Sequence, residues 1–188
     1  MFIIFCKNLS QDEFITRTIR IPRKHDDLLR KISNDTGRSV SAIINQILKP
    51  YIHFTRFYHQ GQIMTVDIEE IKLIMETMTD EEAYQTGRKT GQKRVKDNLL
   101  MLGLNLDFYS IKWYITEVMD KYCGWFKCTY YKQGTEHVFH VRHRLNRKWS
   151  LFIESYFESM IGSLLDKGID INLTDTTVTM KIPDNLNR

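Results

Sequence analysis

Residues 16–21 read Thr-Arg-Thr-Ile-Arg-Ile, and with the proline that follows they decide the predicted fold of the N-terminal part. β-Branched side chains are frequent in this stretch, and its end alternates so that Ile19 and Ile21 share one face. Pro22 has no backbone N–H to give to a sheet ladder, so the pattern predicts a strand that ends there. The other face of this strand carries Thr16, Thr18 and Arg20.

Two amphipathic helices are predicted after the strand. The first covers about residues 24–35, and Gly37 is placed to end it in a left-handed conformation. Ser39 then suits the N-cap of a second helix, whose length Pro50 limits. The apolar stripes consist of Leu28, Leu29 and Ile32 in the first helix and of Ala42, Ile43 and Ile47 in the second.

A strand and two helices within residues 14–50 make a unit too small to fold alone. A lone strand leaves its backbone N–H and C=O groups without partners, and so short a segment buries little apolar surface. We therefore predict a homodimer, in which two chains pair their strands antiparallel as a two-stranded ribbon and interlock their helices.

Residues 18–44 resemble the ribbon-helix-helix DNA-binding family of the MetJ, Arc and CopG repressors. The shared features are an alternating strand closed by proline, an apolar-striped helix, and Gly-Arg-Ser-Val-Ser at residues 37–41, which opens the second helix. The resemblance covers the N-terminal segment only. It implies that the ribbon lies in the major groove of DNA, a docking mode that β-ribbon proteins use.

The resemblance also implies which side chains contact DNA. The outward residues of the ribbon, Thr16, Thr18 and Arg20, read base edges, and Arg20 has the donors for a bidentate contact with guanine. Arg17 departs from the pattern because it falls in phase with the inward isoleucines, so either the ribbon frays there or this side chain leans toward phosphate. Phosphate contacts are expected from Arg17, Arg23, Lys24, Arg38, Ser39, Val40 and Ser41.

Positive charge is concentrated in this same part of the chain. Residues 14–58 hold nine Lys/Arg and three Asp/Glu, whereas the rest of the chain has a slight excess of acidic residues. A local positive field of this kind suits a polyanion such as DNA. A solvated basic surface without a partner is the alternative interpretation.

Composition predicts a globular protein of the cytoplasm. The chain has 188 residues, of which 42% are hydrophobic and 27% charged, and it contains no apolar run long enough to span a membrane. Residues 1–13 are predicted to form an N-terminal arm, whose apolar start ends at Lys7 and lacks the pattern of a signal peptide. Three cysteines, an odd number, fit a reducing compartment.

The remaining residues predict a second domain of the α+β class. An aromatic stripe in residues 51–66 predicts a connecting helix, and residues 67–188 predict helices with a small antiparallel sheet. Thr79 and Glu82 suit a capping box, while Gly87 and Gly91 permit close helix packing. Gly168 is expected to cap the last helix. The expected helices span about residues 68–78, 79–102, 106–122 and 147–166, and the expected strands 125–131, 137–142 and 176–182.

Metal and catalytic motifs are weak in this second domain. The most metal-like cluster consists of His137, His140 and His143 with Cys123 and Cys128. On a strand the spacing of three places His140 on the face opposite the other two histidines, and the cysteines are five apart, unlike the pairs of common zinc sites. The remaining candidate metal ligands are His137, His143 and Cys123. The Gly-Arg-Lys-Thr-Gly stretch at residues 87–91 lacks the order of a phosphate-binding loop. We therefore predict no enzyme activity and no cofactor.

These observations predict a sequence-specific DNA-binding transcription regulator that acts as a homodimer, with a C-terminal domain for effector sensing or assembly. The expected partners are double-stranded DNA, a second copy and a small-molecule effector, with no membrane. Two alternatives remain open. One is an antitoxin-like interaction module, and the other is a metal-responsive regulator similar to the nickel sensors among ribbon-helix-helix proteins.

Overall fold

The computed structural model describes residues 15–56 and 65–184. The chain divides into two compact units, unit 1 (residues 1–55) and unit 2 (residues 56–188), and their boundary falls inside the segment predicted to connect two domains. The predicted arm over residues 1–13 lies outside the described residues, as does the middle of the predicted connecting helix.

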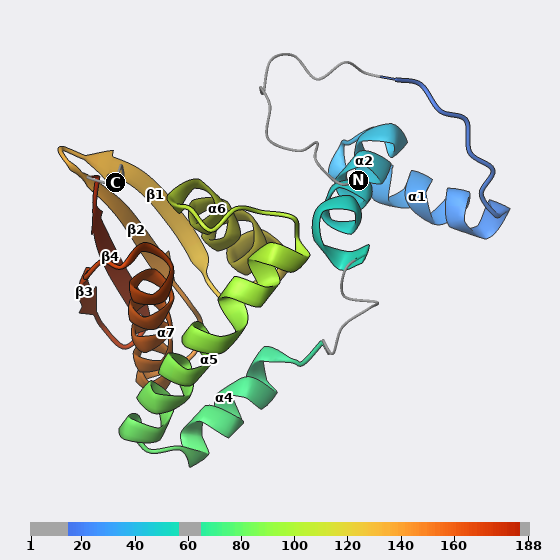
Figure 1. Cartoon of the computed structure of the whole chain (residues 1–188). Coiled ribbons are helices and arrows are strands. Elements are labelled where there is room, and N and C mark those ends of the chain that lie inside the picture. The colour runs from blue at the N-terminus through green and yellow to red at the C-terminus, as the bar shows by residue number, and fades with distance from the viewer. Residues whose placement is uncertain (1–14, 57–64, 185–188) are drawn as a thin grey trace. The chain divides into compact units, whose positions relative to one another are not determined.

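Unit 1 contains two helices, α1 (Arg23–Thr36) and α2 (Val40–Pro50), followed by a π-helical turn, η1 (Tyr51–Thr55) (Figure 1). Gly37 ends α1 with a φ of +66°, as its position predicted. Ser39 caps α2, because its side-chain oxygen accepts a hydrogen bond from the Ala42 N–H at 3.2 Å. Both predicted helices are therefore confirmed, within about one residue of their expected ends.

The predicted N-terminal ribbon is wrong. Residues 15–22 contain no strand, and the described chain begins its regular structure with α1. The sheet found among the described residues is built instead from residues 127–183 of unit 2. A β-branched sequence has strand propensity, but a strand forms only where a second strand completes its ladder of hydrogen bonds. Residues 15–22 pair with no strand in the described part of the chain.

Unit 2 contains a four-stranded antiparallel sheet in the order β1-β2-β4-β3 (Figure 1). The hairpin between its first two strands turns at Gly134, which has a φ of +58°. The second and last strands match their predicted ranges closely, the first lies two residues later than predicted, and β3 was not predicted at all. The strands are β1 (Lys127–Gln133), β2 (Glu136–Arg142), β3 (Asp170–Leu173) and β4 (Thr177–Pro183).

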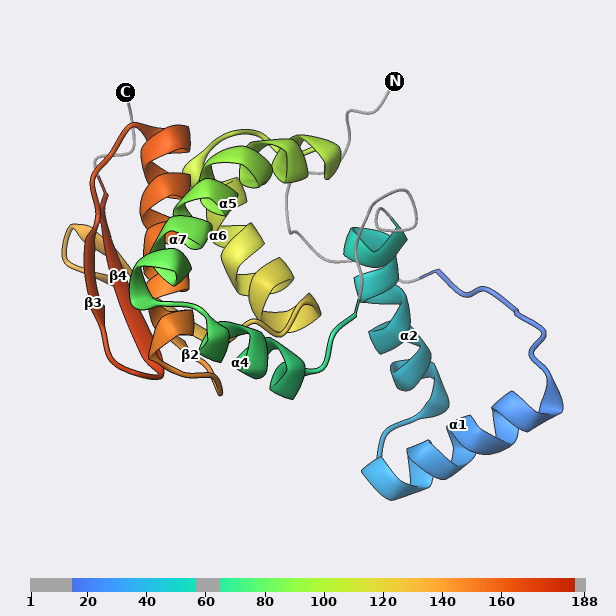
Figure 2. The same cartoon turned by 90° about the horizontal axis from the view of Figure 1, so that it is seen from below.

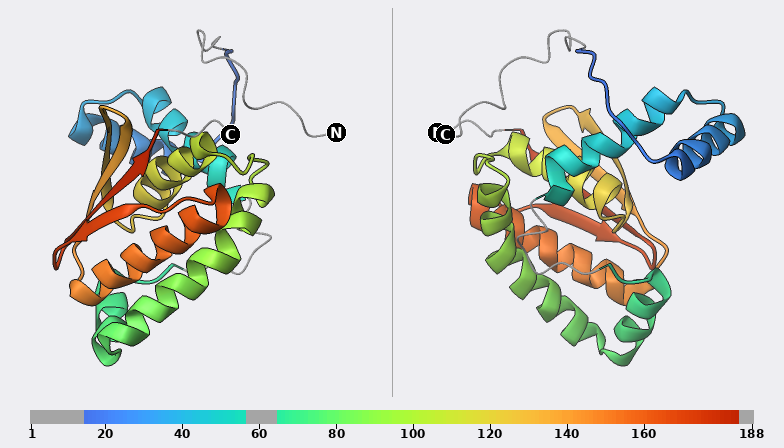
Figure 3. Two further views of the ribbon diagram at one scale, coloured as in Figure 1. Left: turned by 60° about the vertical axis from the view of Figure 1, so that its left-hand side comes forward. Right: turned by 90° about the vertical axis from the view of Figure 1, so that its right-hand side faces the viewer.

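Helices cover one face of this sheet. Figures 2 and 3 show α7 between the sheet and α5, while the π-helical η2 packs beside β1. Alternate sheet residues such as Phe139, Val141 and Met180 face this helical layer and are fully buried. No helix in the described ranges is long and apolar enough to cross a membrane. The helical segments are α4 (Ile68–Thr77), α5 (Asp80–Met101), α6 (Phe108–Trp113), η2 (Tyr114–Tyr122) and α7 (Arg147–Leu165).

Of the two helix caps predicted from the sequence of unit 2, one is confirmed and the other is wrong. Thr79 and Glu82 form the predicted capping box, in which each side chain bonds the other residue's backbone N–H. The predicted cap at Gly168 is wrong, because α7 ends at Leu165 and its C-cap is Asp166, which takes the left-handed conformation with a φ of +53°. A short polar side chain tolerates that conformation better than most residues do.

The contact between α5 and α7 depends on two glycines of α5. A Cβ at Gly87 would overlap the carbonyl oxygen of Phe152, and a Cβ at Gly91 would overlap the carbonyl oxygen of Tyr156. Glycine at these two positions lets the two helix backbones approach closely, as their spacing predicted. The core of unit 2 continues from this contact to the sheet.

Candidate functional site

Unit 1 presents a positively charged surface to solvent. Between residues 15 and 55 the sequence has eight Lys/Arg and three Asp/Glu, and all eight basic side chains are exposed. Arg30 forms an ion pair with Asp26 at 2.6 Å, and Arg38 donates a hydrogen bond to Gln46 at 2.7 Å. The other six are Arg17, Arg20, Arg23, Lys24, Lys31 and Lys49.

The residues predicted to read bases lie together on one exposed segment. Thr16, Thr18 and Arg20 alternate along residues 15–22, which precede α1 and are solvent-exposed throughout. Arg17 is exposed as well. It is therefore not buried on an inward apolar face with Ile19 and Ile21, as its position in the predicted ribbon implied. Without a ribbon, the structure gives these side chains no fixed common face.

The residues predicted to contact phosphate gather at the beginnings of the two helices. Arg23 and Lys24 lie in the first turn of α1. Arg38 and Ser39 precede α2, whose first N–H groups point outward from the positive end of the helix. The Ser33 hydroxyl donates to the Arg38 carbonyl at 2.5 Å, which ties α1 to the start of α2. The α2 set is completed by Val40 and Ser41.

The apolar stripes of unit 1 remain largely uncovered. Helix α1 has no buried residue, and its Leu28 and Ile32 side chains are 59% and 44% exposed. In α2 only Ile43 is buried, whereas Ile47 is 58% exposed. The predicted stripes are present, but one chain does not enclose them, and exposed apolar surface of this kind marks a contact site.

The candidate metal ligands do not form a metal site. His143 bonds Ser150 at 2.8 Å, Cys123 is exposed, and His137 uses both ring nitrogens for hydrogen bonds with other side chains. Within residues 15–56 and 65–184, no group of three His, Cys, Asp or Glu side chains is placed to hold a metal ion.

His137 belongs to a hydrogen-bonded chain that sequence reasoning missed. Its Nδ1 lies 2.7 Å from the Tyr130 hydroxyl, and its Nε2 lies 2.8 Å from Asp184. Lys132 also bonds Asp184, and chiefly for that reason the pKa of this carboxyl group is lowered. In the neutral imidazole, an ionised Asp184 accepts the Nε2 proton, which leaves Nδ1 as the acceptor for the tyrosine hydroxyl. These hydrogen bonds fasten the end of β4 to the β1–β2 hairpin. Only the register of the sheet brings these residues together, and no local motif signals them.

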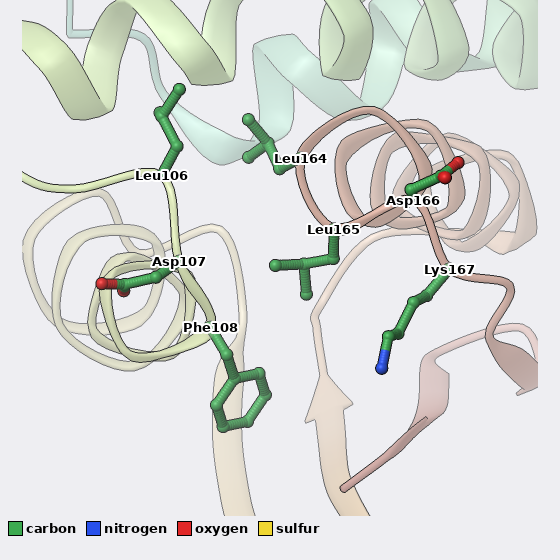
Figure 4. Close-up of a pocket in the computed structure, with 7 residues that line it drawn as sticks. All are labelled: Leu106, Asp107, Phe108, Leu164, Leu165, Asp166 and Lys167. Atoms are coloured by element: carbon green, nitrogen blue, oxygen red, sulfur yellow. The ribbon is translucent and has the colours of Figure 1, made fainter. Parts of the chain in front are cut away.

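A pocket of about 450 Å³ lies where the segment before α6 passes the end of α7. Figure 4 shows the Leu165 and Phe108 side chains beside the gap, with the Lys167 amine directed toward it and the Asp166 carboxylate turned away. A pocket of this volume has room for a small organic ligand. Its other lining residues are Leu106, Asp107 and Leu164.

No family model, curated protein or solved structure matches this chain. The likeness of residues 18–44 to ribbon-helix-helix proteins therefore stays a prediction from sequence. Chemically, the feature that points most directly to a partner is the exposed basic and apolar surface of unit 1.

Proposed function

We propose that the chain is a DNA-binding transcription regulator that acts as a homodimer through unit 1. One observation carries this proposal. The eight exposed cations and the uncovered apolar stripes occur in the same short unit, which is too small to be stable with those stripes in water. A second copy covers the apolar surface and doubles the positive charge. Double-stranded DNA, with its negatively charged backbone, is the partner that such a surface attracts.

Phosphate contacts supply most of the affinity in this proposal. Arg23 and Lys24 reach one stretch of backbone from the start of α1, and Arg38 reaches another from the start of α2. The N–H groups at Val40 and Ser41 add donors at a positive helix end. Sequence preference comes from Thr16, Thr18 and Arg20 on the exposed segment before α1.

Replacing Arg20 with alanine is expected to weaken binding to the preferred operator by about 5- to 150-fold, since a bidentate base contact contributes about 1–3 kcal/mol of discrimination. Selection from a random DNA library provides the operator, and titration by fluorescence anisotropy measures the loss. Arg30→Ala is the matched control, because it removes the same charge from a side chain that is paired with Asp26. Equal affinities for wild type and Arg20→Ala would remove Arg20 from base recognition.

Dimerisation is expected to depend on the uncovered stripe of α1. The double variant Leu28→Gln, Ile32→Gln should sediment as a monomer at a concentration where the wild type is a dimer, because it removes two apolar side chains from the contact. Leu73→Gln with Ile74→Gln, at exposed apolar positions of α4, is the control. Dissociation by the α4 variant alone would place the dimer contact in unit 2.

Unit 2 is proposed to sense an effector through the pocket beside Phe108 and Leu165. Phe108, which lines the pocket, packs on the His137 ring with 4.1 Å between the ring centroids. The hydrogen bonds of His137 with Tyr130 and Asp184 hold that ring in place. The proposal also carries a cytoplasmic location, in which the thiols of Cys123 and Cys128 stay reduced.

A further inference from the structure

The middle of α5 in unit 2 carries five basic residues within nine positions, 88–96, and all five are exposed. Lys89, Lys93 and Lys96 follow one another at helical spacing, so they form a single row, which we call the α5 lysine row. The buried residues of the same helix include Gly87 and Gly91, which face α7. We infer that the α5 lysine row is a second DNA-binding surface, which contacts the phosphate backbone.

The positive charge of the row does not reflect a general excess of basic residues in unit 2. Residues 56–188 hold eighteen Lys/Arg and eighteen Asp/Glu, so unit 2 is neutral as a whole. None of the three lysines forms an ion pair with a described residue. Like charges three or four residues apart destabilise a helix by about 0.2–0.5 kcal/mol per pair. A polyanion bound along the row removes that repulsion.

The geometry of the row suits a nucleic-acid backbone. A helix rises about 1.5 Å per residue, so Lys89 and Lys93 are separated by about 6 Å along the axis and the whole row by about 10 Å. Double-stranded DNA offers one negative charge per about 1.7 Å of its axis, so each lysine meets a phosphate without distortion of the duplex. A membrane surface fits less well, because the apolar side chain at the middle of α5, Val95, is buried in the protein.

The inference rests on the proposed function, and the salt dependence of DNA binding tests the two separately. The probe is a labelled random-sequence DNA duplex of about 30 base pairs, titrated with full-length protein at several salt concentrations. Three proteins are compared: wild type, the triple variant Lys89→Gln, Lys93→Gln, Lys96→Gln, and a control. The control, Arg142→Gln, Arg144→Gln, Lys181→Gln, removes the same charge elsewhere in unit 2. Glutamine is a good helix former, so α5 should persist, and circular dichroism verifies this.

The triple variant is expected to lower the slope of log K against log salt by about 2 to 3, since each lost phosphate contact contributes about 0.9. The control should keep the wild-type slope. A wild-type slope in the α5 variant, or an equal loss in the control, would overturn the inference while leaving the proposed function in place. A wild type that binds no DNA would overturn the proposed function itself. Tighter binding of wild type to an RNA duplex than to the DNA would overturn the assigned partner.

Discussion

Replacing Gly91 with valine is expected to destabilise unit 2 by about 3 kcal/mol, because the added atoms have no room between α5 and α7. The new Cβ overlaps the carbonyl oxygen of Tyr156, which is backbone and cannot rotate away, as well as the Ser159 hydroxyl. Relief requires α5 to move off α7, which opens the contact that leads into the core. Urea unfolding of the full chain, followed by tryptophan fluorescence, measures the loss.

Gly162→Ala is the matched control for this prediction. Gly162 also lies within a helix, α7, but a Cβ there meets no atom within 4 Å. Alanine at this position should stabilise the helix by up to about 1 kcal/mol, since glycine is the poorer helix former. The two substitutions therefore have opposite signs, and an unchanged midpoint for Gly91→Val would show that the helices are not in close contact.

Features of the fold with a local signal were predictable from the sequence. The capping box at Thr79 and Glu82, the left-handed Gly37 and the turn at Gly134 each depend on a few neighbouring residues. The glycine pair of α5 was predictable for the same reason, because its spacing of four places both residues on one helix face. Helices with clear apolar stripes followed from their periodicity.

Features that depend on a distant partner and leave no periodic pattern or turn signal of their own were not predictable. The strand expected at residues 16–21 required a second strand, and its β-branched residues do not provide one. Strand β3 spans only four residues, too few for a periodic pattern, and exists because it pairs with β4. The Tyr130–His137–Asp184 chain likewise depends on register, since 47 residues separate its histidine from its aspartate. The residues expected to contact DNA were assigned from the family resemblance, and no local pattern tests that assignment.

His143 is expected to make unit 2 sensitive to acid. The side chain is buried, its Nε2 lies 2.8 Å from the Ser150 hydroxyl, and its Nδ1 has no hydrogen-bond partner in the described part of the chain. Burial lowers the pKa of His143 to about 4, and the nearby backbone of Leu145 offsets only part of that effect. The folded protein therefore holds this imidazole neutral at pH values where an exposed histidine is protonated.

The direction of the pH effect follows from proton linkage. Below the ordinary histidine pKa of 6.5 the unfolded chain binds a proton at His143 that the folded chain does not bind. The free energy of unfolding therefore falls as the pH decreases from 6.5 to about 4. Below pH 4 both states are protonated at this site and its contribution levels off. The full loss is about 3 kcal/mol, since each unit of pKa shift corresponds to about 1.4 kcal/mol.

Two substitutions separate this titration from the hydrogen bond of His143. His143→Gln retains a donor for the Ser150 hydroxyl but cannot titrate, so its unfolding free energy should change less between pH 7 and pH 4 than that of wild type. Ser150→Ala should lose about 1 kcal/mol at every pH and keep the wild-type dependence, because the histidine remains. Acidic groups such as Glu154, whose pKa is raised above its usual 4.5 chiefly by burial, also titrate in this range, but they are common to all three proteins, so the difference between the curves isolates His143. Parallel curves for wild type and His143→Gln would mean that burial does not hold the imidazole neutral, and the acid sensitivity would then arise elsewhere.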